Sequence, residues 1–525
     1  MKTKTPHKLP TGQLTILALC RLSEPIAMTS VFPYLPEMIE SFGVPKNDIA
    51  KWAGWSSTIF CLCQAFTAIF WGRLSDHYGR KPIILFGLAN TAATVLLWGF
   101  STNLTMAMIA RALQGFMSGN VGIIRTMVAE LCPWKELQPR AFSIMPLVWN
   151  VGSVIGPAFG GVLVKQSHHG DLLERYPYAL PNIFAAALFA VSITIGFLFL
   201  HETLETAKDK RDIGRTLGDA LLKAVNPRSF NSCYLQPPEV SRGTEEEPLL
   251  QSAKSPTDDE ETVLCDNSIP NMQKEANPKW KEVFRLQSTF ALMAYTLLAM
   301  HDFAYQQLLP VFMYHPFDPR DSSDASQPLF QHLPFLFNRG FGLSHTRIGV
   351  FFSIAGAFSM LVQFFIFPPI TSHFGTLRTF KTCITIYPFI YLLTPYTVLL
   401  PTEHTRQAAL LLAVLLKQSV SVFMFPCCII LLTNSACSLK VLGTLNGVAM
   451  TTSGLGRAAG PALAGNLFTV GVEMECVLLP YAVLAAVAVL SLVPAYFMAE
   501  CKGFGSSDEE EEEADEEERE DERAC

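Results

Sequence analysis

The sequence predicts an all-α membrane protein with twelve transmembrane helices arranged as two homologous six-helix bundles. Half of the 525 residues are hydrophobic and only 16% are charged, so the long uncharged stretches are typical of membrane spans. These stretches fall into two sets of six on either side of a polar interval, and motifs of the first set recur in the second. Because backbone in lipid must satisfy its own hydrogen bonds, each stretch is expected to be a helix.

The apolar stretches follow one another with short connections, and each is about long enough to cross a bilayer at roughly twenty residues per span. The first six spans are predicted at 14–40, 50–71, 83–101, 105–131, 141–165 and 179–200. The second six are predicted at 287–313, 345–370, 379–400, 407–433, 441–470 and 478–499. The expected organisation is an N-terminal tail (1–13), an N-terminal bundle (14–200), a central linker (201–286), a C-terminal bundle (287–500) and an acidic tail (501–525).

Charged residues outside the spans predict the topology. The N-terminal tail carries three lysines and lacks the apolar core of a secretory signal, so it is expected to lie in the cytoplasm. Arg73, Arg80 and Lys81 fall in a short loop on the same side, as the positive-inside rule requires. Both termini are therefore predicted to be cytoplasmic, and the host membrane is expected to be a plasma or vacuolar membrane. The charged linker and acidic tail are expected to be largely disordered.

Other classes of protein have no support in the residue pattern. The thirteen cysteines are scattered and lack the spacing of zinc ligands, so no metal site is expected. The sequence shows no nucleophile–base constellation and no phosphate-binding loop, so we expect neither an enzyme nor an organic cofactor. The expected partners are a small-molecule substrate and the lipid bilayer, without nucleic acid, and the expected state is monomeric.

Glycines spaced four residues apart give two spans a smooth face, and the second copy lies 304 residues after the first. The residues concerned are Gly152, Gly156, Pro157, Gly160 and Gly161 in the fifth span, and Gly456, Gly460 and Pro461 in the eleventh. Such stripes are commonly plain helix-packing surfaces. The prolines favour a functional bend as well, because proline in a helix frees a carbonyl. Similar offsets for separate motifs indicate that the two halves are homologous, which is a transporter architecture.

These motifs resemble the major facilitator superfamily. The loop after the second span carries Gly72, Asp76, Gly79, Arg80 and Lys81 in the order typical of that family. The run around Arg111 in the fourth span is similar to the family's second motif, and the fifth-span stripe to the motif of its antiporter branch. The chain is therefore most similar to twelve-span drug:H⁺ antiporters and, more narrowly, to the zinc-induced-facilitator-like group.

The resemblance implies a conformational latch in the loop after the second span. Asp76 would dock at the positive N-terminus of the eleventh span in the outward-open state, and Glu130 would hold Arg80. Gly72, Gly79 and Lys81 complete the expected latch. The second-half copy has Ser372 and His373 where an acid is expected, so a symmetric latch is in doubt.

Charged residues inside the spans are candidates for function, because each costs about 2.5–3.5 kcal/mol at mid-bilayer and must face the protein interior. Glu24 and Asp302 are predicted to carry protons, since a carboxylate removed from water binds a proton more readily, and His301 would assist. The resemblance assigns Arg111 a role in proton coupling. Further residues expected to line a cavity are Arg21, Gln114, Arg125, Asn150, Lys417 and Arg457.

Each of these assignments has a structural alternative. Arg21 and Glu24 lie one helical turn apart and would neutralise each other without any transport role. Arg125 would equally make a structural contact to the first or second span. His301 beside Asp302 could also hold a metal ion, but a single pair without further ligands argues against a metal site.

The sequence thus predicts a secondary active transporter that moves a small organic solute by alternating access, through proton-coupled antiport or export with H⁺ as the coupling ion. One alternative is a proton-independent or symporting metabolite facilitator whose charges are structural pairs. Another is a non-transporting membrane sensor that signals through its linker and tail.

Overall fold

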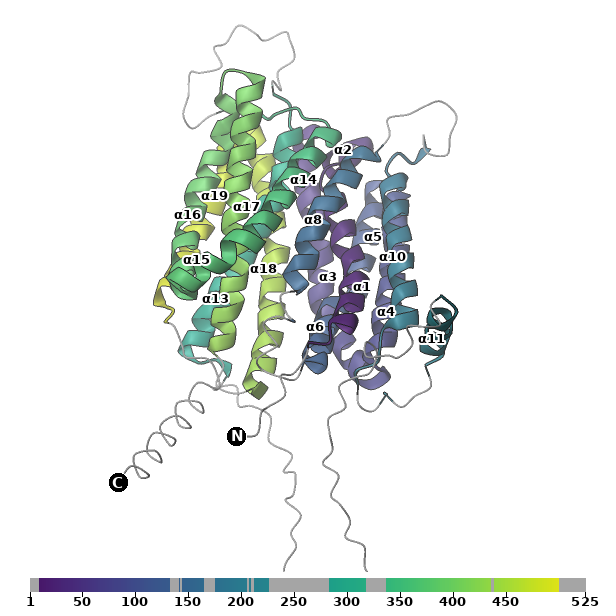
Figure 1. The fold of residues 1–525 in the computed structure, drawn as a ribbon. Helices are drawn as coiled ribbons and strands as arrows, with labels where there is room; N and C mark the ends of the chain where they lie inside the picture. Colours follow the sequence, from purple (N-terminus) through teal and green to yellow (C-terminus); the bar gives the residue numbers. More distant parts are fainter. Residues whose placement is uncertain are drawn as a thin grey trace, which may run out of the picture.

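The structure is a computed structural model that describes residues 9–132, 141, 144–164, 175–204, 207–208, 212–225, 283–317, 337–435 and 439–499. Within these ranges the chain is helical apart from turns, short connections and one isolated bridge between Phe337 and Cys476. The helices form two bundles that lie side by side (Figure 1). The acidic tail and most of the central linker lie outside the described residues.

The N-terminal bundle contains the six predicted spans of the first half, two of which are interrupted. Its helices are α1 (Thr11–Ser30) with α2 (Leu35–Ser41), α3 (Ile49–Tyr78), α4 (Arg80–Gly99), α5 (Leu104–Met117) with α6 (Asn120–Leu131), α8 (Ile144–Val162) and α10 (Ala179–Phe199). The bend of 56° between α1 and α2 follows from Pro33 and Pro36, which cannot continue the backbone hydrogen-bond ladder.

The C-terminal bundle contains the second six spans. Its helices are α13 (Leu286–Tyr314), α14 (His345–Leu361) with α15 (Phe367–Phe374), α16 (Thr376–Tyr396), α17 (Glu403–Asn434), α18 (Leu439–Glu473) and α19 (Leu478–Phe497). A π-helical turn at Val362–Ile366 joins α14 to α15, just before Pro368 and Pro369 remove two backbone donors.

The prediction of twelve spans is confirmed. In the part of the chain that the structure describes, eight helices are long and apolar enough to cross a membrane on their own, and the bent α1–α2 pair is a ninth. The other three spans, α5–α6, α13 and α18, are less apolar because they carry polar groups such as Arg111, Asp302 and Arg457. Since the number of crossings is even, α1 begins and α19 ends at the same end of the bundle, which we call the tail side; the opposite end is the far side.

The backbone shows the internal repeat directly. Gly79 joins α3 to α4 with φ 109° and ψ 156°, and Gly375 joins α15 to α16 with φ 80° and ψ 157°. Both conformations lie in the left-handed half of φ space, which glycine adopts without strain. The glycine stripes are equivalent too: α8 packs its stripe on α1, and α18 packs its stripe on α13.

The two bundles meet along two helix pairs, α3 with α18 and α8 with α14. Their backbones approach closely towards the far side, where a Cβ on Gly54 would lie 2.2 Å from the carbonyl oxygen of Pro461. The other pair is similar, since a Cβ on Gly349 would lie 2.6 Å from the carbonyl oxygen of Pro157. The prolines of both stripes therefore sit where one bundle touches the other, and the structure is closed at the far side.

One further helix, α11 (Ile213–Val225), lies in the interval expected to be largely disordered. It packs on the tail-side end of α10 at the edge of the N-terminal bundle (Figure 1). Gly214 and Gly218 face α10, while Ile213 and Leu217 are exposed.

We predict that Gly54→Ala opens the far side. The added methyl would overlap backbone atoms of α18 only when the bundles are closed, at a cost on the order of 1–3 kcal/mol. Spin labels at Lys51→Cys and Arg347→Cys should report a longer distance in this variant. Gly122→Ala is the matched control, because nothing lies within 4 Å of a Cβ there. Identical distance distributions in both variants would rule out this contact as a determinant of closure.

Candidate functional site

A fully buried ion pair lies in the middle of the C-terminal bundle. Asp302 of α13 and Lys417 of α17 have side chains that are 0% and 2% exposed, and Lys417 Nζ lies 2.7 Å from Asp302 Oδ1. Tyr387 and Ser421 donate hydrogen bonds to the same oxygen at 3.0 and 3.1 Å. Gln306 donates to the other oxygen at 2.7 Å. Both carboxylate oxygens are thus satisfied without water.

Three helices have to converge to build this site. Asp302 and Gln306 lie four residues apart on α13, and Lys417 and Ser421 lie four apart on α17, so each pair shares one helix face. Tyr387 reaches in from α16. Taking two charges out of water is costly, and it is offset only when geometry and additional hydrogen bonds are good.

Aromatic rings enclose the pair. The ring of Tyr305 stacks on Tyr391 with 5.1 Å between centroids, and Lys417 Nζ lies 5.4 Å from the centre of the Tyr305 ring. His301 is also fully buried, and its Nδ1 lies 2.8 Å from the hydroxyl of Tyr391. Among the described residues, His301 Nε2 has no hydrogen-bond partner, and Lys417 Nζ has none besides its ion pair with Asp302.

The ion pair borders the space between the bundles. Lys417 and Gln306 line a narrow central cavity of about 60 Å³, together with Trp149 and Phe352. Its walls come from α1 and α8 of one bundle and from α13, α14 and α17 of the other. A change in the Asp302–Lys417 contact can therefore alter the packing between the two bundles.

The N-terminal bundle holds a second buried pair. Arg21 and Glu24 of α1 form an ion pair, with side chains 10% and 7% exposed. Asn120, at the start of α6, donates a hydrogen bond of 3.0 Å to Glu24. Whereas Asp302 takes its cation from another helix, Glu24 takes it from its own helix. This pair can therefore persist while helices move relative to one another.

The other predicted cavity residues are placed as follows. Arg111 donates to Gln114 at 2.9 Å and lies over the ring of Trp98 at 4.2 Å. Arg125 of α6 reaches across to α18, where its Nη1 lies 2.8 Å from the sulfur of Met450. Arg457 lies over Phe303 at 5.5 Å, and Asn150 is half-buried on α8.

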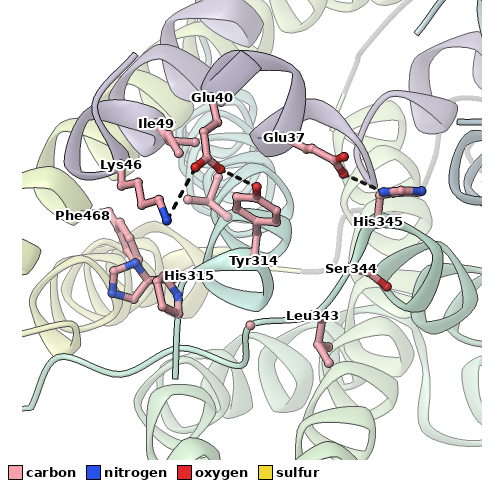
Figure 2. Close-up of a pocket in the computed structure, with 13 residues that line it drawn as sticks. Glu37, Glu40, Lys46, Ile49, Tyr314, His315, Leu343, Ser344, His345 and Phe468 are labelled. Atoms are coloured by element: carbon pink, nitrogen blue, oxygen red, sulfur yellow. Dashed lines mark hydrogen bonds and ion pairs between the residues drawn. The ribbon is translucent and has the colours of Figure 1, made fainter. Parts of the chain in front are cut away.

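A polar cavity of about 350 Å³ lies between the bundles at the far side (Figure 2). His345 Nδ1 of α14 lies 2.6 Å from a carboxylate oxygen of Glu37 on α2. Figure 2 shows Glu40 between Lys46 and Tyr314; the Tyr314 hydroxyl donates to it and Lys46 Nζ lies 3.7 Å away. Two carboxylates of the first bundle thus bind two side chains of the second, and these contacts hold the far side closed.

The predicted latch residues form a network at the tail side. Arg80 binds Glu130 at 3.0 Å and Ser75 at 2.7 Å, and it also pairs with Asp76. The backbone N–H groups of Arg80 and Lys81 donate to Glu202 at 2.8 and 3.0 Å, so that this carboxylate sits on the positive N-terminus of α4.

Gly79 is required at this position for two reasons. Its φ is positive, and a Cβ there would lie 2.5 Å from Glu202. Gly72, in contrast, has open space beside it. The Asp76 side chain is 61% exposed, and it has no contact with α18 among the described residues. Because its docking on α18 is expected only in the outward-open state, this part of the latch stays a prediction.

The junction of α3 and α4 also contacts the start of α11. Lys81 Nζ lies 2.5 Å from Asp212 and donates to the backbone carbonyl of Phe197 at 2.9 Å. Partial burial opposes ionisation of Asp212, but Lys81 and two backbone N–H groups outweigh it and hold the pKa of this carboxyl below its ordinary value. The contact should consequently persist as the pH falls to the ordinary range of aspartate and be lost only below it.

Comparisons with known proteins identify the family. The model of the Major Facilitator Superfamily matches residues 17–461. The chain belongs to the major facilitator superfamily. It is 38% identical to the multidrug transporter mfsB of Aspergillus fumigatus over 94% of this chain and 84% of that protein. It is 27% identical to Protein ZINC INDUCED FACILITATOR 1 of Arabidopsis thaliana, over 88% of this chain and 84% of the relative.

Solved structures share the fold. The human organic anion transporter MFSD10 superposes with a TM-score of 0.56 over 93% of this chain and 100% of that chain, at 18% identity. The nucleoside transporter NupG gives a TM-score of 0.55 over 93% of this chain and 98% of its own, at 13% identity. The protein is therefore an integral multi-pass membrane transporter for a small molecule and not an enzyme.

We predict that Asp76→Asn folds normally but slows transport. Asp76 is largely exposed, and Arg80 keeps Glu130 and Ser75 as partners, so the loss should cost at most about 1 kcal/mol and thermal unfolding should be nearly unchanged. Loss of the charge–dipole contact in the outward-open state should slow turnover in proteoliposomes roughly two- to five-fold. Asp76→Glu, which keeps the charge, is the control. Turnover equal to that of the unmodified protein would exclude the latch.

Proposed function

We propose that this transporter exports a small organic molecule in exchange for protons. The observation that supports the proposal best is the fully buried Asp302–Lys417 pair beside the central cavity. An ionisable residue inside a membrane span is a candidate for function by default, and carboxylates in such places serve in the proton relays of pumps and transporters. The names of two relatives agree with export: mfsB is a multidrug transporter, and a 190-residue region is 33% identical to the class H tetracycline resistance protein of Pasteurella multocida.

In the proposed cycle a proton and Lys417 compete for Asp302. With Asp302 ionised, Lys417 is held at 2.7 Å and the three helices α13, α16 and α17 are drawn together. When a proton binds an Asp302 oxygen, the carboxyl becomes neutral and the attraction to the ammonium is lost. Lys417 then turns towards the central cavity that it already lines. When Asp302 releases this proton to the side of the membrane opposite to the one it came from, its carboxylate is ionised again and the ion pair with Lys417 re-forms.

Further groups have supporting roles in this proposal. His301 keeps an unsatisfied nitrogen beside Asp302 and would pass the proton. Glu24 would supply a second proton site in the N-terminal bundle, with Asn120 retaining it when Arg21 moves. Arg111, which stacks on Trp98, would supply a fixed positive charge inside the N-terminal bundle.

The orientation is part of the proposal. We place the tail side in the cytoplasm, because Arg73, Arg80 and Lys81 lie there at the junction of α3 and α4, and positively charged connections between spans stay inside. The far-side cavity then faces the exterior or the lumen of a vacuole, and the structure is closed to that side. The transporter would act as a monomer in a plasma or vacuolar membrane.

The most direct test of proton coupling is a double variant that removes both the carboxylate of Asp302 and the ammonium group of Lys417. Asp302→Asn alone leaves Lys417 buried without a counterion, which typically costs 3–5 kcal/mol. The double variant Asp302→Asn/Lys417→Gln removes both charges, so it should fold. In proteoliposomes it should move substrate down a concentration gradient but should not respond to an imposed pH gradient.

Glu403→Gln is the matched control, since that acid is exposed and pairs only with the exposed Arg347 among the described residues. It should retain the full response to the pH gradient. If the double variant still concentrates substrate against its gradient when the pH gradient is imposed, proton coupling through Asp302 is wrong. If the unmodified protein itself ignores the pH gradient, the facilitator alternative is favoured.

A further inference from the structure

We propose that the solute is a small organic anion with an apolar body, bound between the bundles through Arg125 and Arg457. The inference rests on the proposed transport of an organic solute, but it does not depend on proton coupling. It concerns the substrate class, and it comes from two arginines inside the membrane that form no ion pair with an acid among the described residues.

The membrane interior of the protein has an excess of positive charge. Its seven charged side chains, five basic and two acidic, are Arg21, Glu24, Arg111, Arg125, Asp302, Lys417 and Arg457. Each acid is paired with one cation, Glu24 with Arg21 and Asp302 with Lys417. The remaining three arginines form no ion pair with an acid within the described residues.

Arg111 is not accessible to a solute. It is 8% exposed and lies inside the N-terminal bundle, covered by Trp98 and bonded to Gln114. Its charge is stabilised by the ring and by the amide oxygen, as is common for an arginine over an aromatic face. Arg125 and Arg457 remain, and both are only partly buried.

These two arginines border the same stretch of α18. Arg125 extends from α6 to Met450, and the thioether sulfur that it contacts is only a weak acceptor. Arg457 lies seven residues beyond Met450, two turns along the same face and about 10 Å away. Among the described residues, its Nε is buried without a hydrogen-bond partner. Two guanidinium groups, one from each bundle, thus border one stretch of α18, and neither forms an ion pair with an acid within the described residues.

An anionic solute would provide a counterion for the two arginines, and a cationic solute would not. Arg125 and Arg457 carry positive charge and form no ion pair with an acid within the described residues, so the region repels further positive charge. A carboxylate would accept charge-assisted hydrogen bonds from a guanidinium, which are about twice as strong as neutral ones. The ring of Phe303, which lies 5.5 Å from the Arg457 guanidinium, would contact an apolar body.

Two dyes of the same shape and opposite charge test the inference. Fluorescein is an anion and rhodamine 123 is a cation, and both have a xanthene body. Binding to the purified full-length protein is measured by fluorescence anisotropy, which needs no pH gradient and no transport. Fluorescein should bind at least ten-fold more tightly, and Arg457→Gln or Arg125→Gln should weaken its binding roughly ten- to hundred-fold.

Three comparisons make the test specific. Arg378→Gln, an exposed arginine at the tail side, should leave fluorescein binding unchanged. Arg457→Lys should keep part of the affinity, because it keeps the charge. Thermal unfolding should not fall in Arg457→Gln or Arg125→Gln, since each removes an uncompensated charge, whereas a purely structural arginine would lower the unfolding temperature on removal.

Equal or tighter binding of rhodamine 123, failure of fluorescein to bind, or unchanged fluorescein binding in both arginine variants would each overturn the inference. A protein that binds fluorescein as expected but does not respond to a pH gradient would contradict the proposed proton coupling alone.

Discussion

The cost of keeping charge inside a membrane governs this structure. Asp302 and Lys417 are almost completely removed from water, a cost that is offset only when the geometry and the additional hydrogen bonds are good. Three helices of the C-terminal bundle meet at this point and provide donors to both carboxylate oxygens, while Lys417 Nζ has its ion pair and the nearby ring of Tyr305. The tyrosines of α13 and α16 exclude solvent around the pair. If a proton bound Asp302, the attraction that draws these helices together would be lost.

The second constraint is the contact between bundles. Backbones can touch only where side chains are small, so glycines and the carbonyls of two prolines form both interfaces at the far side. Around them, Glu37 and Glu40 bind His345 and Tyr314 across the interface. Apolar side chains of both bundles surround these polar contacts, since one buried hydrophobic cluster includes Tyr34 and Leu35 of the first bundle and Leu308 and Phe312 of the second. Lys417 connects the contact between the bundles with the buried Asp302–Lys417 pair, because its side chain lines the central cavity between the bundles.

Much of the fold could be predicted from the sequence, because lipid permits only helices and the motifs repeat at a nearly constant offset. The glycine stripes and the loop with Gly79 indicated the two halves and their packing. The chemistry of the site was harder to predict. Asp302 and Lys417 were recognised as separate charges, but their pairing depends on the relative rotation of α13 and α17, which no local pattern encodes. Tyr387 and Ser421 could not be identified as partners of Asp302 from the sequence, because hydroxyl side chains are common in membrane spans.

Other contacts were missed for different reasons. Glu202 follows directly on α10 and looked like part of a polar linker, although its carboxylate caps α4. The apolar residues of α11 recur at helical spacing, at Ile213, Leu217 and Leu221, but the helix is short and lies in a charged interval that was expected to be largely disordered. It is stabilised by α10 and by the Lys81–Asp212 pair. Glu37 and Glu40 lie at the end of a span, where charges are ordinary, and only the approach of the other bundle gives them partners.

The central claim is that Asp302 binds and releases the coupling proton. Infrared difference spectroscopy on the reconstituted protein, with the double variant Asp302→Asn/Lys417→Gln as the blank, measures the carbonyl stretch of a protonated carboxyl directly. The account predicts that this signal appears as the pH is lowered, over the same range in which substrate transport responds to pH, and that it is missing from the blank. A signal of equal size in the blank, or transport that responds to pH while Asp302 stays ionised, would contradict it.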